Sequence, residues 1–314
     1  MPDQEAAADQ QGVHEAQRRE AAARTGKIFV PLALLEDLLL PLEPLLPEVL
    51  LGVRRGFVGY PWFMKPRRIV SLVPSLTEAL FAFGVGDRVV GRTRYCTQPP
   101  GAVGRVAKVG GTKKVDVARV LGLQPDLVIS VREENTREDI EALQTAGVPA
   151  FVGAPETVAD AVEMLGELAE RVEAPETAAM LGPIKRVYGR LCGAERGAEP
   201  RRVFVPIWKG PYMSVGSDTY VHDVLRICSG ENVCGGYTRY PVVGLQEVEE
   251  LQPEVVLLPD EPYPFSAVDL AEFYALDIPA AREDRIHLVD GKLLTWYGPR
   301  MASSLTQLAA LLGF

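Results

Sequence analysis

Two short segments in different halves of this chain repeat each other. Leu123–Ser130 reads Leu-Gln-Pro-Asp-Leu-Val-Ile-Ser, and Leu251–Leu258 reads Leu-Gln-Pro-Glu-Val-Val-Leu-Leu. In both segments a turn-forming tripeptide introduces an apolar run that is typical of a buried parallel strand. Upstream of each segment stands the tripeptide Thr-Arg-Tyr, at Thr93–Tyr95 and at Thr238–Tyr240. Two repeats in the same order favour two related α/β lobes over one continuous sheet.

The stretch between the two repeats is expected to be helical. Thr157 and Asp160 form a capping box, and the apolar residues that follow recur at the spacing of one buried helical stripe. The pattern breaks at residues 173–176 and then resumes in a second helix, which Pro183 should kink. A flexible linker would be richer in Gly and Ser and would lack such a stripe. We therefore expect a rigid helical bridge at residues 156–196.

The bridge separates two segments in which strand and helix patterns alternate. The first strand of lobe one, Arg68–Val73, runs directly into Pro74–Glu78, which has the pattern of a turn with a capping box. These patterns predict an α/β lobe at residues 67–155 and a second at 197–314. Two lobes held apart by a helical bridge leave a cleft between them. The alternative is an ordinary crossover helix within one large sheet.

The first 66 residues differ from the rest and form an N-terminal extension. We expect residues 1–26 to be disordered and the Leu- and Pro-rich residues 28–64 to be an accessory segment whose role the sequence does not specify. Acidic residues interrupt the apolar run well short of the roughly 18 residues that a membrane span needs. The start lacks the basic and apolar pattern of a signal peptide, so the expected location is cytoplasmic. The alternative is a periplasmic or extracellular protein whose start is misassigned.

Charge and cysteine content narrow the functional classes. A formal net charge of −9 argues against nucleic acid as a partner, because such surfaces need clustered Lys and Arg. The four cysteines lack zinc-site spacing and are expected to be free thiols, although an oxidising compartment would allow a Cys228–Cys234 disulfide. Cys96 with His222 or His287 is a weak candidate for a catalytic thiol–imidazole pair, because nothing in the sequence brings them together.

Aromatic residues gather in the loops expected to follow the strands. Aromatic side chains outside periodic core positions often contact a ligand. The alternative is that these side chains plug the loops against the sheets, which we expect for about half of them. The residues concerned are Tyr95, Trp208, Tyr212, Tyr240, Tyr263, Trp296 and Tyr297.

Taken in series, the motifs resemble the helical-backbone (class III) solute-binding proteins of ABC importers, and most of all their vitamin B12-binding branch. The resemblance covers residues 67–314 and is carried by Arg68–Glu78, Thr93–Pro100, Lys108–Gly111, Leu123–Ser130, Trp208, Tyr220–Asp223, Tyr240-Pro241 and Trp296–Arg300. It implies two Rossmann-like lobes bridged by a long backbone helix, with the ligand in the cleft between them. It also implies a monomer without a cofactor that binds cobalamin, haem or an iron chelate and does not transform it.

Carried over by position, the resemblance assigns ligand-binding roles to residues of both lobes. In lobe one these are Pro74, Ser75, Tyr95, Gly111 and Glu134. In lobe two they are Trp208, Tyr240, Glu261, Trp296 and Arg300.

The resemblance also implies an ABC permease as the partner. Ala118 and Gln246 stand where B12-binding relatives carry the glutamates that dock onto the permease, with Asp116 and Glu247 close by. Two functional classes therefore remain open. One is a binding protein without turnover. The other is a cytoplasmic orphan protein or an enzyme that handles a corrinoid or chelate, with Cys96 and the acidic loop residues as its chemistry.

Overall fold

The computed structural model describes residues 65–194 and 199–313. The expectations for residues 1–26 and 28–64 fall outside this part of the chain, and so does nearly all of the predicted extension. Among the helices of the described residues, none combines the length and the apolar character that a membrane crossing requires.

The first half of the described chain builds a parallel sheet of five strands in the order β3-β2-β1-β4-β5. The central strands β1 and β4 are entirely buried, as expected for a sheet that is covered on both faces. The strands are β1 (Ile69–Ser71), β2 (Val89–Arg92), β3 (Ala107–Lys108), β4 (Leu127–Val131) and β5 (Ala150–Gly153). The helices connecting them are α4 (Pro74–Ala82), α5 (Val117–Gly122) and α6 (Arg137–Thr145), with 3-10 turns η2 (Gly86–Arg88) and η3 (Val103–Arg105).

The second half repeats this architecture with a parallel sheet of four strands in the order β7-β6-β8-β9. The two repeated sequence segments lead into β4 and β8, which are central strands of their sheets. The strands are β6 (Arg201–Phe204), β7 (Gly230–Asn232), β8 (Val255–Pro259) and β9 (Ile286–Val289). The helices are α9 (Tyr220–Ile227), α10 (Leu245–Leu251), α11 (Ala267–Tyr274), α12 (Pro279–Arg282), α13 (Lys292–Thr295) and α14 (Met301–Leu312).

Alternation along the strands divides the buried side chains into three clusters. In β8, Val255 and Leu257 belong to a large cluster that also contains residues of the first sheet and of the bridging helices, whereas Val256 and Leu258 face a separate cluster with α11. In β1, Ile69 likewise joins the large cluster, while Val70 packs against α5 and α6 in a third. Successive strand residues point to opposite faces, so each sheet is a middle layer between helices. The large cluster is shared by both sheets.

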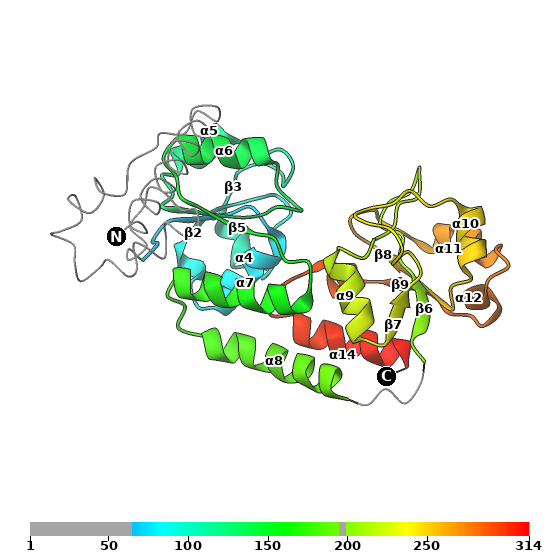
Figure 1. The fold of residues 1–314 in the computed structure, drawn as a ribbon. Coiled ribbons are helices and arrows are strands. Elements are labelled where there is room, and N and C mark those ends of the chain that lie inside the picture. Colours follow the sequence, from blue (N-terminus) through cyan, green and yellow to red (C-terminus); the bar gives the residue numbers. More distant parts are fainter. Residues whose placement is uncertain (1–64, 195–198, 314) are drawn as a thin grey trace, which may run out of the picture. The chain divides into compact units, whose positions relative to one another are not determined.

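The link between the sheets consists of two helices in sequence, α7 (Val158–Arg171) and α8 (Thr177–Gly193) (Figure 1). The capping box of Thr157 and Asp160 opens α7, as the sequence predicts. The chain turns between Val172 and Glu176, and the two helices then pack against each other, so the bridging segment is not one straight rod. α8 contains Pro183 and also packs against α14, which connects the bridge to lobe two.

The structure confirms the predicted fold class of two Rossmann-like α/β lobes linked by helices, and it corrects one local detail. The capping box expected at Pro74–Glu78 is absent, because α4 begins at Pro74 itself without a side-chain cap. Thr77 turns inward, and its hydroxyl donates to the carbonyl of Val73 at 2.8 Å. A proline at the first helical position needs no partner for its nitrogen, which favours this direct strand-to-helix connection.

Candidate functional site: the loops that follow the strands

Seven of the ten residues expected to bind ligand lie just after strand ends. In parallel sheets these ends share one edge, where ligands of α/β proteins usually bind. Ser75 follows β1, Tyr95 follows β2, Gly111 follows β3 and Glu134 follows β4. Trp208 follows β6 and Glu261 follows β8. Pro74 precedes Ser75 at the first position of α4, Tyr240 lies in the segment after β7, and Trp296 and Arg300 lie between α13 and α14.

Trp296, Glu261 and Arg300 form one connected group. The indole Nε1 of Trp296 donates to Oε1 of Glu261 at 2.6 Å. The guanidinium of Arg300 lies 5.5 Å from the ring centroid of Trp296, and the ammonium of Lys292 lies 5.7 Å from it. Only 7% of Trp296 is exposed, so this side chain holds the group together and offers little surface for stacking.

Arg300 also ties this group to lobe one. Its Nε donates to Oε2 of Glu78 on α4 at 2.7 Å. Gly298 lies close to the same helix, since a Cβ on it would stand 3.4 Å from the carbonyl oxygen of Ser75 and 3.3 Å from Cβ of Ala79. Gly298 also has φ +121°, which L side chains rarely adopt. The segment between α13 and α14 is therefore fitted against the start of α4.

Glu134 is a carboxylic acid whose surroundings disfavour its charged form. Burial, together with repulsion from the carboxylate of Glu261, raises the pKa of Glu134 to about 7, while Lys113 partly offsets this. The pKa of Glu261 is also raised by burial, against the opposing effects of Lys292 and of the bond from Trp296. A carboxyl that titrates near neutrality in the strand-end region marks a candidate functional site.

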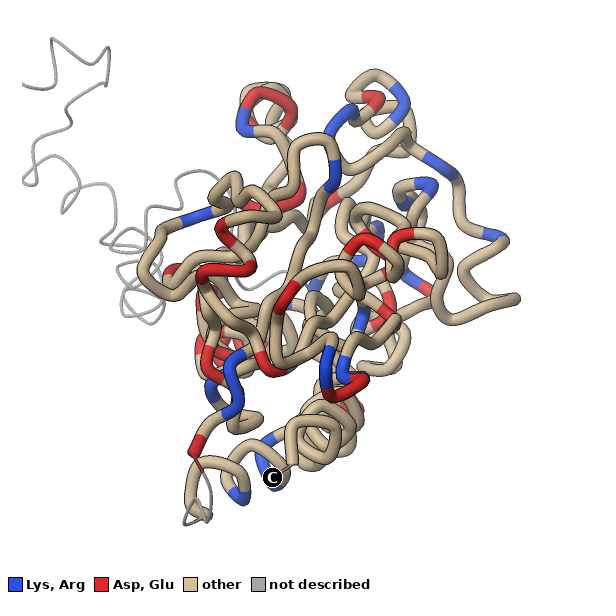
Figure 2. Tube along the Cα trace, turned by 90° about the vertical axis from the view of Figure 1, so that its right-hand side faces the viewer, with Lys and Arg blue, Asp and Glu red and all other residues tan. Residues whose placement is uncertain are grey.

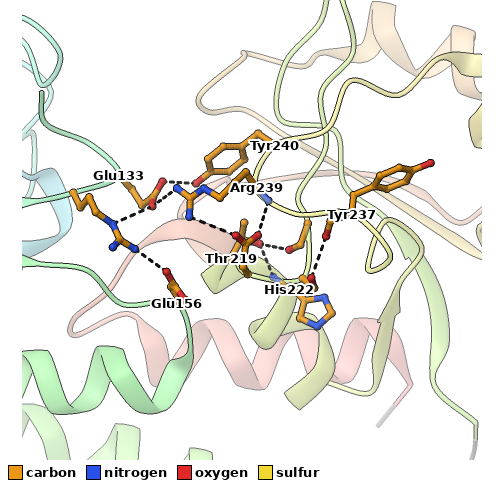
Figure 3. A network of polar contacts seen from close by, with 11 residues as sticks. Glu133, Glu156, Thr219, His222, Tyr237, Arg239 and Tyr240 are labelled. Atoms are coloured by element: carbon orange, nitrogen blue, oxygen red, sulfur yellow. Dashed lines mark hydrogen bonds and ion pairs between the residues drawn. The ribbon is translucent and has the colours of Figure 1, made fainter.

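Next to Glu134, Glu133 connects the lobes directly, a role that the sequence did not reveal. Its Oε1 accepts from Nη2 of Arg239 at 2.5 Å, and its Oε2 accepts from the hydroxyl of Tyr240 at 2.8 Å (Figure 3). Burial raises the pKa of Glu133, but the bonds from Arg239 and Tyr240 outweigh it and bring the pKa below its ordinary value. The sequence shows the second Thr-Arg-Tyr tripeptide, but it does not show that Arg239 and Tyr240 of this tripeptide pair with Glu133 in the other lobe.

Two aromatic side chains of the strand-end loops are largely exposed. Tyr95 is 52% exposed and Trp208 is 45% exposed. The guanidinium of Arg94 lies 5.0 Å from the Tyr95 ring centroid, and Trp208 meets Tyr263 edge to face at 5.8 Å. A Cβ on Gly111 would stand 3.4 Å from Cε2 of Tyr95, so the small residue lets the tyrosine lie close to the backbone. Apolar ring surface is available here in both lobes.

Pro74 and Ser75 are buried rather than surface-lining. The hydroxyl oxygen of Ser75 has no hydrogen-bond partner among the described residues. Buried hydroxyls are usually paired, so this position is unusual, and it lies where the backbone of Gly298 approaches α4.

The candidate catalytic pair is not assembled. Cys96 is fully buried and within hydrogen-bond distance of the hydroxyls of Thr77 and Thr93, and burial raises its thiol pKa. His222 contacts Asn232, with 3.3 Å between its Nδ1 and the asparagine Nδ2. His287 lies on β9. A raised pKa disfavours the thiolate that catalysis would need. Within residues 65–194 and 199–313 there is also no group of three His, Cys, Asp or Glu side chains that could hold a metal ion.

Charge is distributed over both lobes without segregation by sign, with acidic and basic positions interspersed along most of the chain (Figure 2). Such a distribution does not resemble the basic face of a nucleic-acid-binding protein.

Comparison with known proteins identifies the family. The sequence pattern of the family described as periplasmic binding protein matches residues 69–292. This chain belongs to the periplasmic binding protein family. Members of this family are binding proteins, which confirms that the protein is not an enzyme and leaves no catalytic role for Cys96.

Individual relatives agree with this assignment. This periplasmic binding protein is 29% identical over 259 residues to the "Uncharacterized ABC transporter substrate-binding lipoprotein YvrC" of Bacillus subtilis (strain 168), covering 78% of this chain and 79% of the relative. It is 28% identical over 193 residues to the "Vitamin B12-binding protein" of Yersinia pestis (strain Pestoides F), covering 61% of this chain and 69% of the relative. In fold it is similar to the periplasmic vitamin B12 binding protein BtuF of Vibrio cholerae, with TM-score 0.67, 21% identity and coverage of 79% and 96%.

The expected cytoplasmic location is wrong. The family is described as periplasmic, and one relative is named a lipoprotein, which points to a location outside the cytoplasm. The prediction rested on the sequence pattern of the first residues of the chain, whereas the family assignment rests on residues 69–292.

Proposed function

We propose that this periplasmic binding protein captures a corrinoid of the cobalamin type for an ABC importer and releases it unchanged. The sequence relatives named as vitamin B12-binding proteins support the corrinoid. Haem and iron chelates are the related ligand classes against which this proposal is tested. All of them are metal chelates with extended, partly apolar surfaces.

The observation that carries the proposal is the pair of exposed aromatic side chains, Tyr95 after β2 and Trp208 after β6. One comes from each lobe, and both lie in loops at the strand ends where α/β proteins bind ligands. Aromatic rings exposed in this way contact planar ligands favourably, by about 0.5–1.5 kcal/mol each beyond the burial of their area. Trp296 supports the site by orienting Glu261.

The test is isothermal titration calorimetry with three probes: cyanocobalamin, haemin and ferric enterobactin. We expect cyanocobalamin to bind at a ratio of one to one with the highest affinity. Reverse-phase chromatography of the released ligand should recover unmodified cyanocobalamin. Preferential binding of haemin or of the iron chelate would refute the corrinoid, and failure of all three to bind would refute the ligand class.

The partner proposed for this protein is an ABC permease that touches α5 and α10. The two helices occupy equivalent places, each immediately before a repeated strand, and both Ala118 on α5 and Gln246 on α10 are exposed. Nearby, Asp116 caps α5 by accepting from the backbone of Arg119, and Glu247 accepts from the hydroxyl of Tyr237. Because both carboxylates already accept hydrogen bonds within this protein, we expect them to contribute only weak contacts at the edge of the interface with the permease.

A gain-of-function variant tests this surface. Introducing Ala118→Glu together with Gln246→Glu should strengthen binding to the reconstituted permease and raise its ligand-stimulated ATP hydrolysis. Glu163→Gln, at an exposed position on α7, a helix that packs against α8 and α9, serves as the control variant. If the double variant docks no better than the wild type, the proposed contact surface is wrong.

A further inference from the structure

Several polar bonds join lobe one and its adjoining bridge helix to lobe two. The backbone nitrogen of Val158, at the start of α7, donates to Oδ2 of Asp223 on α9 at 2.8 Å. Arg300 and Glu78 form the second connection, at 2.7 Å. Glu133 with Arg239 and Tyr240 forms the third. The third connection is named the loop bridge below.

The first two connections are anchored in packed structure. Asp223 is buried on α9, a helix that packs against both α7 and α8. Glu78 lies on α4, whose Leu76, Ala79 and Leu80 are buried in the cluster shared by the two sheets. Breaking either bond would leave the surrounding apolar contacts in place, so these connections can act as a fixed base for movement between the lobes.

The loop bridge differs because it joins two loops. Glu133 lies between β4 and α6, and Arg239 and Tyr240 lie between β7 and α10. The Arg239 side chain is 45% exposed and that of Glu133 is 20% exposed, so water reaches the ion pair. An ion pair that water reaches is weak and exchanges partners readily, unlike a buried one.

Besides its partner in the loop bridge, each of the two charged residues has a second neighbour of opposite charge. On one side, Nη1 of Arg239 lies 3.9 Å from Oδ2 of Asp218, whose Oδ1 accepts from the backbone nitrogen of Arg239 at 2.5 Å. On the other side, Nη2 of Arg132 pairs with Glu156 at 2.7 Å while its Nε lies 3.9 Å from Glu133 (Figure 3). Each partner therefore keeps an oppositely charged neighbour when the loop bridge opens, which lowers the cost of opening.

We propose that the loop bridge is a gate at the ligand site, closed by Glu133 in the ligand-free protein and opened for ligand to enter or leave. The ligand-related part rests on the proposed function. Tyr240, which the resemblance assigns to ligand binding, has its hydroxyl committed to Glu133 when the gate is closed. Loss of the Glu133 charge removes the ion pair with Arg239 and weakens the bond from Tyr240, and the loops then separate about the fixed base.

The first experiment measures loop separation without any ligand. Spin labels are attached at Gln144→Cys on α6 and Val268→Cys on α11, both exposed, in a background carrying Cys192→Ala to remove the exposed native thiol. Double electron–electron resonance then compares Glu133→Gln with Glu141→Gln. Glu141 forms an exposed ion pair with Arg137 inside α6, so its substitution makes the same chemical change away from the gate. We expect a longer or broader inter-lobe distance distribution for Glu133→Gln only.

The second experiment measures gating by stopped-flow mixing with cyanocobalamin. If opening limits entry, losing an ion pair of this kind should make the association rate of Glu133→Gln roughly 1.5- to fivefold higher than that of the wild type. Arg239→Gln should behave in the same way, and the double variant should add little because both changes remove one interaction. Tyr240→Phe is a milder variant for use if a charge substitution impairs folding, as judged by circular dichroism.

The outcomes separate the gate from the proposed ligand. Distance distributions for Glu133→Gln and Tyr240→Phe that match the wild type would overturn the gate, whatever binds. A changed distribution without any cyanocobalamin binding would uphold the gate and refute the corrinoid. A changed distribution with unaltered cyanocobalamin association and dissociation rates would overturn the role of the loop bridge in ligand exchange.

Discussion

Neutralising Glu134 should stabilise the protein. Its pKa is raised to about 7 from an ordinary value near 4.5, chiefly by burial and then by Glu261. At 1.36 kcal/mol for each pH unit of difference, ionising this carboxyl in the folded protein costs about 3 kcal/mol relative to the unfolded chain. Glu134→Gln keeps the shape of the side chain without the charge. Allowing for structural relaxation, we expect about 1–3 kcal/mol of added stability at pH 8.

The sign of the pH dependence follows from the direction of this pKa. Between pH 4.5 and about 7, Glu134 holds its proton in the folded protein and loses it in the unfolded chain, so stability falls as the pH rises. The advantage of Glu134→Gln should therefore be near zero at pH 4.5, grow through pH 7 and then level off.

Thermal and urea unfolding at pH 4.5, 6 and 8 measure this difference. For a protein of this size, about 2–4 °C in Tm corresponds to each kcal/mol, so Tm should rise by about 2–12 °C at pH 8. Glu138→Gln, at an exposed position on α6, is the matched control and should show no such pH-dependent gain. Equal effects of Glu134→Gln at pH 4.5 and pH 8, or a loss of stability at pH 8, would refute the reasoning.

Three further changes test other parts of the structure. Trp208→Ala should weaken cyanocobalamin binding roughly tenfold by calorimetry while leaving Tm nearly unchanged, because the side chain is 45% exposed; an unchanged Kd would remove Trp208 from the site. Asp223→Ala should cost about 1.5–3 kcal/mol in urea unfolding, since it leaves the nitrogen of Val158 without its charged acceptor. Asp277→Ala at an exposed ion pair should cost under about 1 kcal/mol, and equal losses would contradict the structural role of Asp223. Of the four cysteines only Cys192 is exposed, so a thiol reagent should modify one thiol in the native protein and all four after unfolding.

Local sequence patterns predicted the architecture because they report on burial along each strand and helix. The repeats at Leu123–Ser130 and Leu251–Leu258 lead into central strands of two separate sheets, and the capping box at Thr157 opens α7. The strands β3, β5 and β7 were not predicted, and β3 and β7, with two and three residues, are too short to show a period.

The candidate site was predicted less completely, since it depends on contacts between distant segments. The sequence predicted Trp296 as an aromatic that faces ligand, but it did not reveal the indole bond to Glu261 or the small exposure of the side chain. Glu133 was overlooked in favour of its neighbour Glu134, because the two are adjacent and only the fold distinguishes them. Glu133 meets a partner 106 residues away in Arg239, and a single sequence holds no record of such a pairing.

The apolar cluster shared by the two sheets makes the protein one cooperative folding unit. Leu80 and Phe83 of α4, Leu165 of α7, Ile184 of α8 and Leu305 of α14 belong to this single cluster, which continues to strands of both sheets. Cutting the chain between α8 and β6 would leave each fragment with a broad apolar face in water, and neither half would be an independent domain. Calorimetry should accordingly show one heat-absorption peak for the two lobes, with equal calorimetric and van't Hoff enthalpies.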